Sequence, residues 1–420
     1  MLTYILSKTF INVAVMGFKI GWLTWEQRKF GEIYDKIRNA FVGTATPYYV
    51  NQGHFYLESN NVKYGKLNFN NEVYINDDFY QKQKPNWLHT GDLVVVQSGH
   101  VGHSAVIPSE LNNTAAHAVI IVAKPKQKID SYFINDYLQT NIARKQIDNI
   151  ATGNTIKHIL ASAMKMFEVS LPSYEEQRPI SNLLAQIDDT ITLQQHKLDQ
   201  LNTLKKGLLQ KMFADKKHPQ PELRFKGFSG DWEQQKLKTV VNRVTRKNVN
   251  NESNLPLTIS AQDGLIAQDH FFGKKVASQN LQNYLLLKKG DFAYNKSYSN
   301  GYPFGSIKRL NKYKEGVISS LYIAFKPKQA DSDYLEQFFD SDKWHREIYS
   351  RAAEGARNHG LLNISPNDFF DADVKLPSSN EEQKMIGDIL KKVSEIITLQ
   401  QKQIDKLNSL KKSLLQNMFI

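Results

Sequence analysis

The feature that most constrains this chain is a segment of 39 residues that occurs twice. Glu175–Phe213 reads EEQRPISNLLAQIDDTITLQQHKLDQLNTLKKGLLQKMF, and Glu381–Phe419 reads EEQKMIGDILKKVSEIITLQQKQIDKLNSLKKSLLQNMF. The two segments align without a gap at an offset of 206 residues, with 21 identical positions. The tripeptide Trp-Glu-Gln also recurs, beginning at Trp25 and at Trp232. The chain is therefore a tandem duplication, and its fold has to use one helix-length segment twice.

Between each tryptophan and its repeated segment, the sequence predicts a globular region that mixes helices and strands. Val42–Leu57 and Leu67–Phe79 are rich in Tyr, Val, Thr and Phe, as strands are. Both regions then follow one order, with a buried strand, a polar loop, a second strand, a helical stretch and a second polar loop. The expected helical stretches are Tyr132–Asp148 and Asp333–Ala353. The two regions share this order but few side chains.

The predicted fold class is α+β, with two globular α+β domains and two long coiled-coil helices in an internal repeat. Pro219 and Pro221 mark a linker after the first helix, because proline ends a helix and favours extended backbone. The predicted boundaries are an atypical N-terminal segment at 1–21, a first domain at 22–170, a first helix at 171–214, the linker at 215–228, a second domain at 229–375 and a second helix at 376–420.

The charge balance points to a polyanion as a partner. Lys and Arg total 54 against 42 Asp and Glu, which gives a formal charge of +12. The first repeated segment is neutral and the second carries +2, so about +10 lies outside the helices. A basic protein without such a partner is the alternative. The chain has no cysteine and no run of about 18 apolar residues, so we expect a cytoplasmic protein without a membrane span.

The repeated segments carry the apolar spacing of a coiled coil. In the first copy the seam runs at alternating intervals of four and three residues from Ile180 to Leu201, and the phase then shifts through Leu204. Gln194 and Gln400 stand at the midpoints of their segments, so an antiparallel pair brings them level. A polar pair inside an apolar seam can fix the register of the helices. Alternatively, each glutamine faces solvent.

Two dissimilar globular regions that alternate with two nearly identical helices carry a family resemblance. With the helix motifs LPS-x-EEQ and L-x-x-L-K-K-x-L-L-Q-x-M-F, the chain resembles the specificity subunit of type I restriction–modification enzymes from about Trp25 onward. The first twenty or so residues depart from the pattern. In that family each globular region is a target recognition domain that reads one half of a split DNA site. The helices form an antiparallel coiled coil that separates the two domains in a pseudo-twofold repeat, sets their spacing and docks two modification (methyltransferase) subunits. Restriction subunits join to form the nuclease.

The resemblance implies that this chain binds double-stranded DNA, has no catalytic residue, and leaves S-adenosylmethionine, ATP and Mg to partner subunits. A helix of 39 residues spans roughly 58 Å, which is comparable to roughly 17 base pairs of duplex. Such a helix can hold two readers on one duplex. Two unlike domains then imply an asymmetric site, whereas two identical domains imply a symmetric one.

The polar loops are the candidate DNA-reading elements, since Asn and Gln suit adenine while Arg and Lys suit guanine. For any single residue the alternative is a solvated turn, because most protein–DNA hydrogen bonds go to the DNA backbone. The candidates in the first region are Gln97, Ser98, His100, His103, Thr152, Asn154, Thr155, Lys157 and His158. Those in the second region are Asn295, Lys296, Tyr298, Asn300, Tyr302, Arg351, Arg357, Asn358 and His359.

Motifs for catalysis are missing from the sequence. It contains no G-x-x-x-x-G-K-[ST] for nucleotide binding and no H-E-x-x-H for zinc. His100 and His103 form H-x-x-H without an evident third ligand, so loop polarity explains them as well. Glu382-Gln383-Lys384 has the E-x-K form seen in nucleases, but it begins a helix, and we interpret it as capping and solvent exposure. The rivals to a DNA-specificity subunit are a coiled-coil adaptor without sequence-specific DNA binding, and a nuclease or methyltransferase that acts alone.

Overall fold

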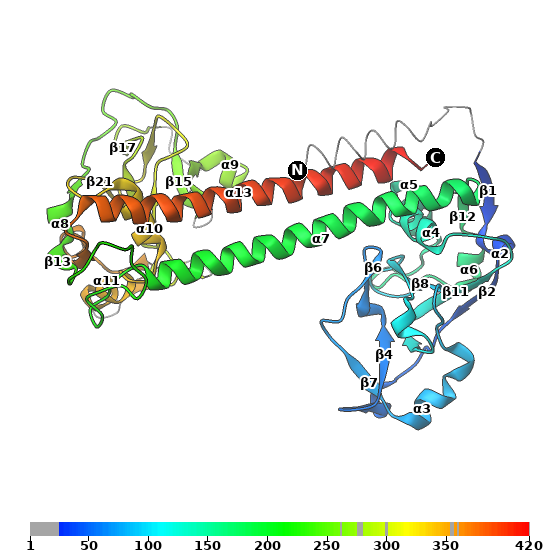
Figure 1. The fold of residues 1–420 in the computed structure, drawn as a ribbon. Coiled ribbons are helices and arrows are strands. Elements are labelled where there is room, and N and C mark those ends of the chain that lie inside the picture. The colour runs from blue at the N-terminus through cyan, green and yellow to red at the C-terminus, as the bar shows by residue number, and fades with distance from the viewer. Residues whose placement is uncertain are drawn as a thin grey trace. The chain divides into compact units, whose positions relative to one another are not determined.

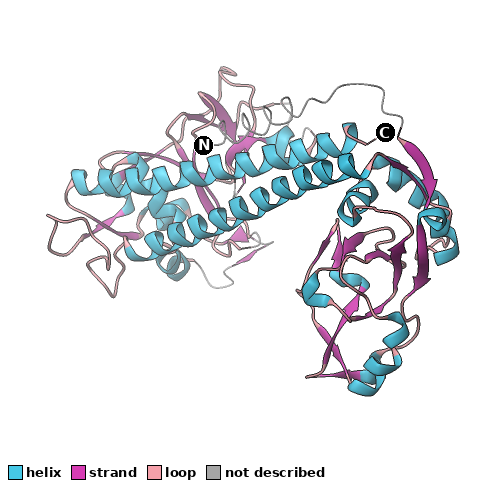
Figure 2. Cartoon of the chain, turned by 45° about the vertical axis from the view of Figure 1, so that its right-hand side comes forward, coloured by secondary structure: helices cyan, strands magenta, loops and turns pink. Residues whose placement is uncertain are grey.

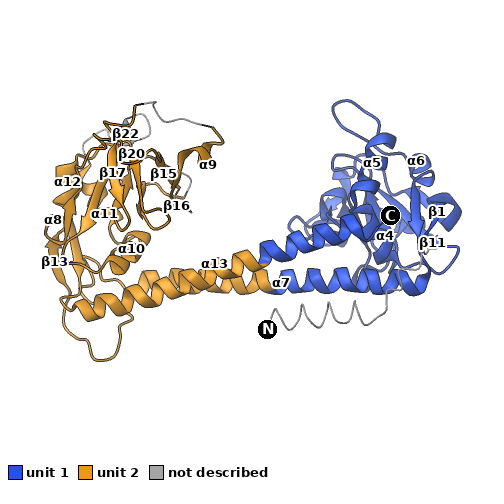
Figure 3. Cartoon of the chain, turned by 90° about the horizontal axis from the view of Figure 1, so that it is seen from above, with its two compact units in different colours: residues 1–193, 404–420 blue, residues 194–403 orange. Residues whose placement is uncertain are grey.

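The computed structural model describes residues 25–260, 263–274, 280–298, 301–352, 357–358 and 361–419. The segment predicted at 1–21 lies outside these residues. The chain divides into two compact units, unit 1 with residues 1–193 and 404–420, and unit 2 with residues 194–403 (Figure 3). Each unit holds one globular region and part of two long helices, α7 (Tyr174–Lys211) and α13 (Asn380–Asn417). The domain boundaries drawn from the sequence stay predictions.

The globular region of unit 1 combines short strands with five short helices among its described residues (Figure 2). Its strands are β1 (Glu26–Lys29), β2 (Tyr34–Asn39), β3 (Tyr49–Val50), β4 (His54–Glu58), β5 (Val62–Lys63), β6 (Lys66–Leu67), β7 (Val73–Ile75), β8 (Leu93–Val96), β9 (Ser104–Val106), β10 (Ala115–His117), β11 (Val119–Pro125) and β12 (Glu168–Leu171). Its helices are α2 (Phe30–Ile33), α3 (Asp77–Lys82), α4 (Ser131–Leu138), α5 (Asn141–Ile150) and α6 (Ala161–Lys165).

The globular region of unit 2 is built in the same manner (Figure 1). Its strands are β13 (Glu233–Lys236), β14 (Val241–Arg243), β15 (Leu257–Ser260), β16 (Gly264–Ala267), β17 (Leu285–Lys288), β18 (Phe292–Asn295), β19 (Ser306–Arg309), β20 (Glu315–Ile318), β21 (Ile323–Pro327), β22 (Arg357–Asn358), β23 (Leu361–Leu362) and β24 (Asp373–Leu376). Its helices are α8 (Leu237–Val240), α9 (Gln268–Phe272), α10 (Ser332–Asp340), α11 (His345–Arg351) and α12 (Pro366–Phe370).

Each unit contains its own central four-stranded sheet, and the two sheets have the same strand order. In unit 1 the order is β2-β11-β8-β9, and in unit 2 the corresponding strands give β14-β21-β18-β19. All neighbouring strands in these sheets are antiparallel. Strand β1 also pairs with β12 from Glu26↔Leu171, and β13 pairs with β24 from Glu233↔Leu376. In each globular region the first strand therefore pairs with the last strand, which directly precedes α7 in unit 1 and α13 in unit 2. This shared topology confirms the predicted α+β class and the duplication.

The remaining strands differ between the units. Unit 1 has a second sheet of order β10-β4-β7-β3, whereas unit 2 has the hairpin β15-β16 and the two-stranded sheet β17-β20. The stretches expected to be strands, Val42–Leu57 and Leu67–Phe79, are interrupted: they contain only short strands, because Pro47 begins a 3₁₀ turn and residues 51–53 form a bend. Each predicted helical stretch is two helices. In unit 1, Thr140 caps the second of them by accepting a hydrogen bond from the Ala143 amide.

The helices α7 and α13 run antiparallel in each unit. In unit 1 the start of α7 packs against the end of α13, and Leu184 shares a core cluster with Phe419. In unit 2 the end of α7 packs against the start of α13, and Phe213 shares a core cluster with Leu390. Leu204, expected in the seam, is exposed instead, because the last turns of α7 direct their apolar residues into the core of unit 2.

The repeated Met-Phe at the end of each helix therefore has a structural role. Phe213 lies 5.3 Å from the Tyr334 ring in the core of unit 2, and Phe419 lies 5.2 Å from the Phe133 ring in the core of unit 1. Each helix begins beside one globular region and ends inside the core that contains the other. The main core cluster of each unit is thus completed by residues from a distant part of the chain.

Candidate nucleic-acid interface

Unit 1 brings its two predicted polar loops together. Residues 97–103 follow strand β8, and residues 151–158 follow helix α5. The Ile159 amide donates a hydrogen bond of 2.9 Å to the Gln97 carbonyl, which joins the two loops through the backbone. We call the segments 97–103 and 151–158 the first loop pair.

Most exposed side chains of the first loop pair come from its second segment. Thr152 and His158 exchange two backbone hydrogen bonds of 2.8 Å, and Ser98 forms a β-bridge with His158. Lys157 lies 3.3 Å from Asp148 in a solvent-exposed pair, which is weak enough to leave the ammonium available to another anion. The exposed candidates are Thr152, Asn154, Thr155, Lys157 and His158. Backbone pairing holds this segment in place while its side chains face solvent.

The other candidates of this region are more enclosed. Gln97 is buried, and among the described residues its Oε1 atom has no hydrogen-bond partner. His103 is only 9% exposed, and its Nδ1 atom likewise finds no partner in the part of the chain that the structure describes. Burial, with the nearby charges of His100 and Arg144, lowers the pKa of His103 to about 4, so its ring is neutral near pH 7. The His100 ring is exposed and stacks on His103 with 5.4 Å between centroids.

Unit 2 joins its loops by the same backbone bond. The Leu362 amide donates a hydrogen bond of 3.0 Å to the Lys296 carbonyl, as Ile159 does to Gln97 in unit 1. Leu362 belongs to the hairpin β22-β23, in which it pairs with Arg357. We call the segments 295–302 and 357–362 the second loop pair. The candidates Asn300 and His359 lie outside the described residues, and for Arg357 and Asn358 only the backbone is described.

The described candidates of the second loop pair differ from those of the first. The Asn295 Oδ1 atom accepts a hydrogen bond of 3.0 Å from the Ser297 amide. Lys296 turns inward, donates to the Ile364 carbonyl at 3.2 Å, and has a pKa lowered by burial. Tyr298 is exposed. Arg351 lies at the end of α11, where Glu347 and Asp373 hold its guanidinium by ion pairs.

A groove of about 650 Å³ lies within unit 2 beside the second loop pair. It is lined by the last turns of α7, by residues 301–308 including Tyr302, and by the segment that joins α10 to α11. Asp340 on this groove accepts hydrogen bonds from Lys205 and Lys308. Burial acts to raise the pKa of Asp340, but the two lysines outweigh burial and hold that pKa below its usual range.

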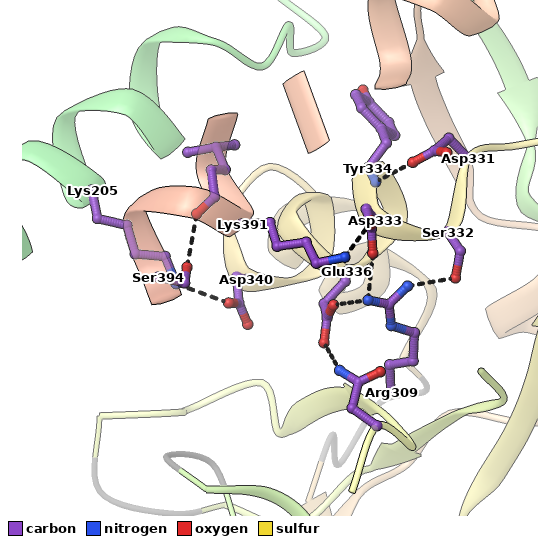
Figure 4. Close-up of polar contacts among 12 residues, drawn as sticks. Lys205, Arg309, Asp331, Ser332, Asp333, Tyr334, Glu336, Asp340, Lys391 and Ser394 are labelled. Carbon is purple, nitrogen blue, oxygen red and sulfur yellow. Dashed lines mark hydrogen bonds and ion pairs between the residues drawn. The ribbon is translucent and has the colours of Figure 1, made fainter. Parts of the chain in front are cut away.

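Figure 4 shows the ion pairs that attach the long helices to the globular region of unit 2. The Arg309 guanidinium contacts both Asp333 and Glu336 of α10, and Lys391 of α13 lies 2.9 Å from Asp333. Burial acts to raise the pKa of Asp333, while the hydrogen bonds from Lys391 and Arg309 lower it further than burial raises it. These cations are engaged inside the unit, so they hold its parts together rather than face a ligand.

The midpoint glutamines lie level with each other. The Gln400 Nε2 atom donates to the Gln194 side-chain oxygen and, at 3.1 Å, to the Gln194 carbonyl. Gln400 is only 5% exposed, so it does not face solvent. Their role in fixing the register stays a prediction.

A second pair of repeated glutamines, which the sequence did not single out, bonds backbone groups beside the start of each long helix. Gln177 donates to the Pro172 carbonyl and accepts from the Asp130 amide, at 2.9 and 3.0 Å. Gln383 makes the same two bonds, to the Pro377 carbonyl and from the Asp331 amide, both at 2.9 Å. The identity of this glutamine in both copies of EEQ was the available signal.

The interpretation of Glu382 as solvent-exposed is wrong. Glu382 is 1% exposed, and Arg224 from the preceding linker binds both of its carboxylate oxygens at 2.7 and 3.0 Å. The repeat mate Glu176 is only half-buried and accepts from the Trp25 indole at 3.3 Å. The helix start therefore holds a buried structural ion pair. Among the described residues, no cluster of three or more His, Asp or Glu side chains could hold a metal ion.

Comparison with known proteins adds to this geometry. The sequence profile of the type I restriction modification DNA specificity domain matches residues 23–203. The chain is thus similar to type I restriction–modification specificity subunits. The match covers the first globular region and most of α7, and so includes the first loop pair.

Relatives of this family include two specificity subunits from Methanocaldococcus jannaschii. The putative MjaX subunit is 24% identical over 196 residues, which is 45% of this chain and 45% of that subunit. The MjaVIII subunit is 24% identical over 165 residues, which is 38% of this chain and 39% of that subunit. The chain thus matches less than half the length of these relatives.

Solved structures in the family share the fold. The S subunit of a type I restriction–modification system from M. genitalium is 15% identical, with a TM-score of 0.61 over 96% of this chain and 98% of that one. A chain from a structure on complex assembly and conformational transition of the type I system has a TM-score of 0.51 at 15% identity, over 93% of this chain and 96% of that one. Among the described residues, no helix is long and apolar enough to cross a membrane.

Proposed function

We propose that this chain is the DNA sequence-recognition subunit of a type I restriction–modification system. The observation that carries the proposal is the repeated loop pair. Both units join two polar loops through one equivalent backbone bond, Ile159 to Gln97 and Leu362 to Lys296, yet fill those loops with different side chains. A constant frame with variable polar side chains suits two readers with different base preferences. Each unit would read one half of a bipartite, asymmetric DNA site.

The charge distribution supports duplex DNA as the ligand. About +10 of the net charge of +12 lies outside the repeated segments, and the two regions that carry the loop pairs, residues 25–174 and 229–380, together hold +6 of it. Lysines and arginines there would neutralise phosphates, and each neutralised phosphate makes the affinity more sensitive to salt. Polar side chains such as Asn154 and Thr155 are exposed and would reach base edges.

The long helices support the assembly part of the proposal. They carry little net charge, and their seam is filled by apolar contacts and the Gln194–Gln400 pair. We expect them to set the spacing of the half-sites and to dock two methyltransferase subunits, with restriction subunits joining the complex in the cytoplasm. S-adenosylmethionine, ATP and Mg would then be bound by those partners, and this chain would be non-catalytic.

The test is the sequence of the methylated DNA. The chain is co-expressed with its methyltransferase subunit, the complex is exposed to genomic DNA, and methylated bases are sequenced. The expected result is one bipartite motif with two unlike halves. A matched pair of variants then assigns the halves: changing Asn154 and Thr155 to Ala should relax one half, and changing Tyr298 to Ala should affect only the other. A complex that methylates without sequence preference would refute the proposal and favour the coiled-coil adaptor.

A further inference from the structure

The hairpin β5-β6 in unit 1 presents an aromatic ring in a backbone conformation that disfavours it. Lys63 pairs with Lys66, so only Tyr64 and Gly65 form the turn. Both have positive φ, +51° for Tyr64 and +82° for Gly65. Two-residue turns of this kind prefer asparagine at the first position, and a bulky residue is strained there. The Tyr64 side chain is also 66% exposed, so burial does not compensate for this strain.

The turn is held firmly against the first loop pair. The Gly65 carbonyl accepts a hydrogen bond of 2.8 Å from Asn135, whose side-chain oxygen accepts another of 2.8 Å from Ser104. Ser104 is buried and directly follows His103 in the chain. The strained turn is therefore fixed by a chain of hydrogen bonds that starts beside the loop pair.

The Tyr64 ring contacts a stacked pair of histidines. Its centroid lies 4.6 Å from that of His103, with the two rings tilted by 46°, and His103 in turn stacks on His100. His103 supports the ring from one side, and it is nine-tenths buried. Lys63 lies 5.5 Å from the Tyr64 ring centroid and is exposed. The result is a rigid exposed ring with a cation beside it, next to residues that the sequence already marks as DNA-reading candidates.

We propose that the Tyr64 turn is a further DNA contact of unit 1, in which the exposed ring packs against a nucleobase and Lys63 neutralises a neighbouring phosphate. The proposal rests on the proposed function, because it assumes that the first loop pair binds duplex DNA. An aromatic ring in a groove of the duplex can make an apolar contact with a base edge such as the thymine methyl group, and a lysine adds salt-dependent attraction to the backbone. The rigid support matters because a ring that is already fixed loses little freedom when the DNA binds.

The strain provides a variant that separates binding from folding. Asparagine suits the positive φ at position 64, so Tyr64→Asn should leave the protein at least as stable as the parent while it removes the ring. Tyr64→Phe keeps the ring and should keep the binding. Tyr132→Ala is the matched control, since Tyr132 lies in the same unit and is 55% exposed but is remote from the loop pair in sequence.

The binding experiment uses the complex with its methyltransferase subunits and a duplex that carries the motif found by methyl-base sequencing. We expect Tyr64→Asn to weaken binding roughly tenfold at the half-site of unit 1, and Tyr64→Phe and Tyr132→Ala to change it by less than about twofold. Unchanged affinity in Tyr64→Asn, with the motif still recognised, would overturn this inference and leave the proposed function intact. Loss of all sequence preference in the parent complex would instead refute the proposed function.

A cross-linking experiment locates the contact. Thymines of the duplex are replaced one at a time by 5-iodouracil, the complex is irradiated, and cross-linked residues are identified by mass spectrometry. The inference expects a cross-link to Tyr64 in the half-site of unit 1, which Tyr64→Asn abolishes. Cross-links that reach the first loop pair at neighbouring positions but never Tyr64 would overturn it.

Discussion

The buried ion pair between the linker and α13 allows a quantitative prediction. Arg224 binds Glu382 with two hydrogen bonds of 2.7 and 3.0 Å, and its third contact is the Gly230 carbonyl at 2.6 Å. The side chains of Glu382 and Arg224 are only 2% and 15% exposed. Arg224→Ala leaves the Glu382 carboxylate buried without a cation. Breaking such a pair typically costs about 3–5 kcal/mol, which exceeds what the intact pair contributes.

The assay is thermal unfolding of the full chain, monitored by differential scanning calorimetry. For a unit of about 200 residues, 1 kcal/mol corresponds to roughly 2–4 °C, so we expect the transition of unit 2 to fall by about 10 °C. The matched control is Lys211→Ala, because the Lys211–Glu222 pair also joins the end of α7 to the linker but is 59% and 72% exposed. That control should change stability by less than about 1 kcal/mol.

A double variant separates burial from charge. In Arg224→Met combined with Glu382→Leu, apolar side chains replace both partners, and most of the lost stability should return because no charge is left buried. The reasoning is refuted if Arg224→Ala and Lys211→Ala have equal effects. It is also refuted if the double variant is less stable than Arg224→Ala alone.

Three further predictions concern the seam, the pH dependence of stability and DNA affinity. Changing Gln194 and Gln400 together to Leu should raise the Tm, because the seam becomes fully apolar. It should also permit other pairing registers, which spin-label distances would detect. Burial raises the pKa of Asp136 to about 8, above its unfolded value of about 4. The free energy of unfolding should therefore fall as pH rises from about 4 to about 8, and Asp136→Asn should remove that slope in denaturant titrations. Lys157→Gln should reduce the slope of log affinity against log salt by about 1 for all duplexes, and an unchanged slope would exclude a phosphate contact.

The sequence predicts the helices well because their information is local and repeated. The expected segment Glu175–Phe213 becomes α7 with both ends displaced by only one or two residues, and the seam positions Leu184 and Leu390 are fully buried. The sequence indicates two polar loops in each region. It does not indicate the backbone hydrogen bond that joins them, since residues 97 and 159 meet only after the sheet has formed. The residues that hold these loops are far apart in the chain, and spacing alone does not identify them.

The sequence does not predict which acidic residue pairs with a given lysine of the long helices. Lys411 of α13 lies 2.7 Å from Asp188 of α7 in unit 1. By the repeat, Lys205 corresponds to Lys411, but Ser394 stands where Asp188 would be. Lys205 instead binds Asp340, an acid supplied by the globular region (Figure 4). The same lysine thus occurs in both helices, but Lys411 pairs with an acid of α7, whereas Lys205 pairs with an acid of the globular region of unit 2. The two helices therefore resemble each other more than their surroundings do, and each is adapted to the globular region in which it ends.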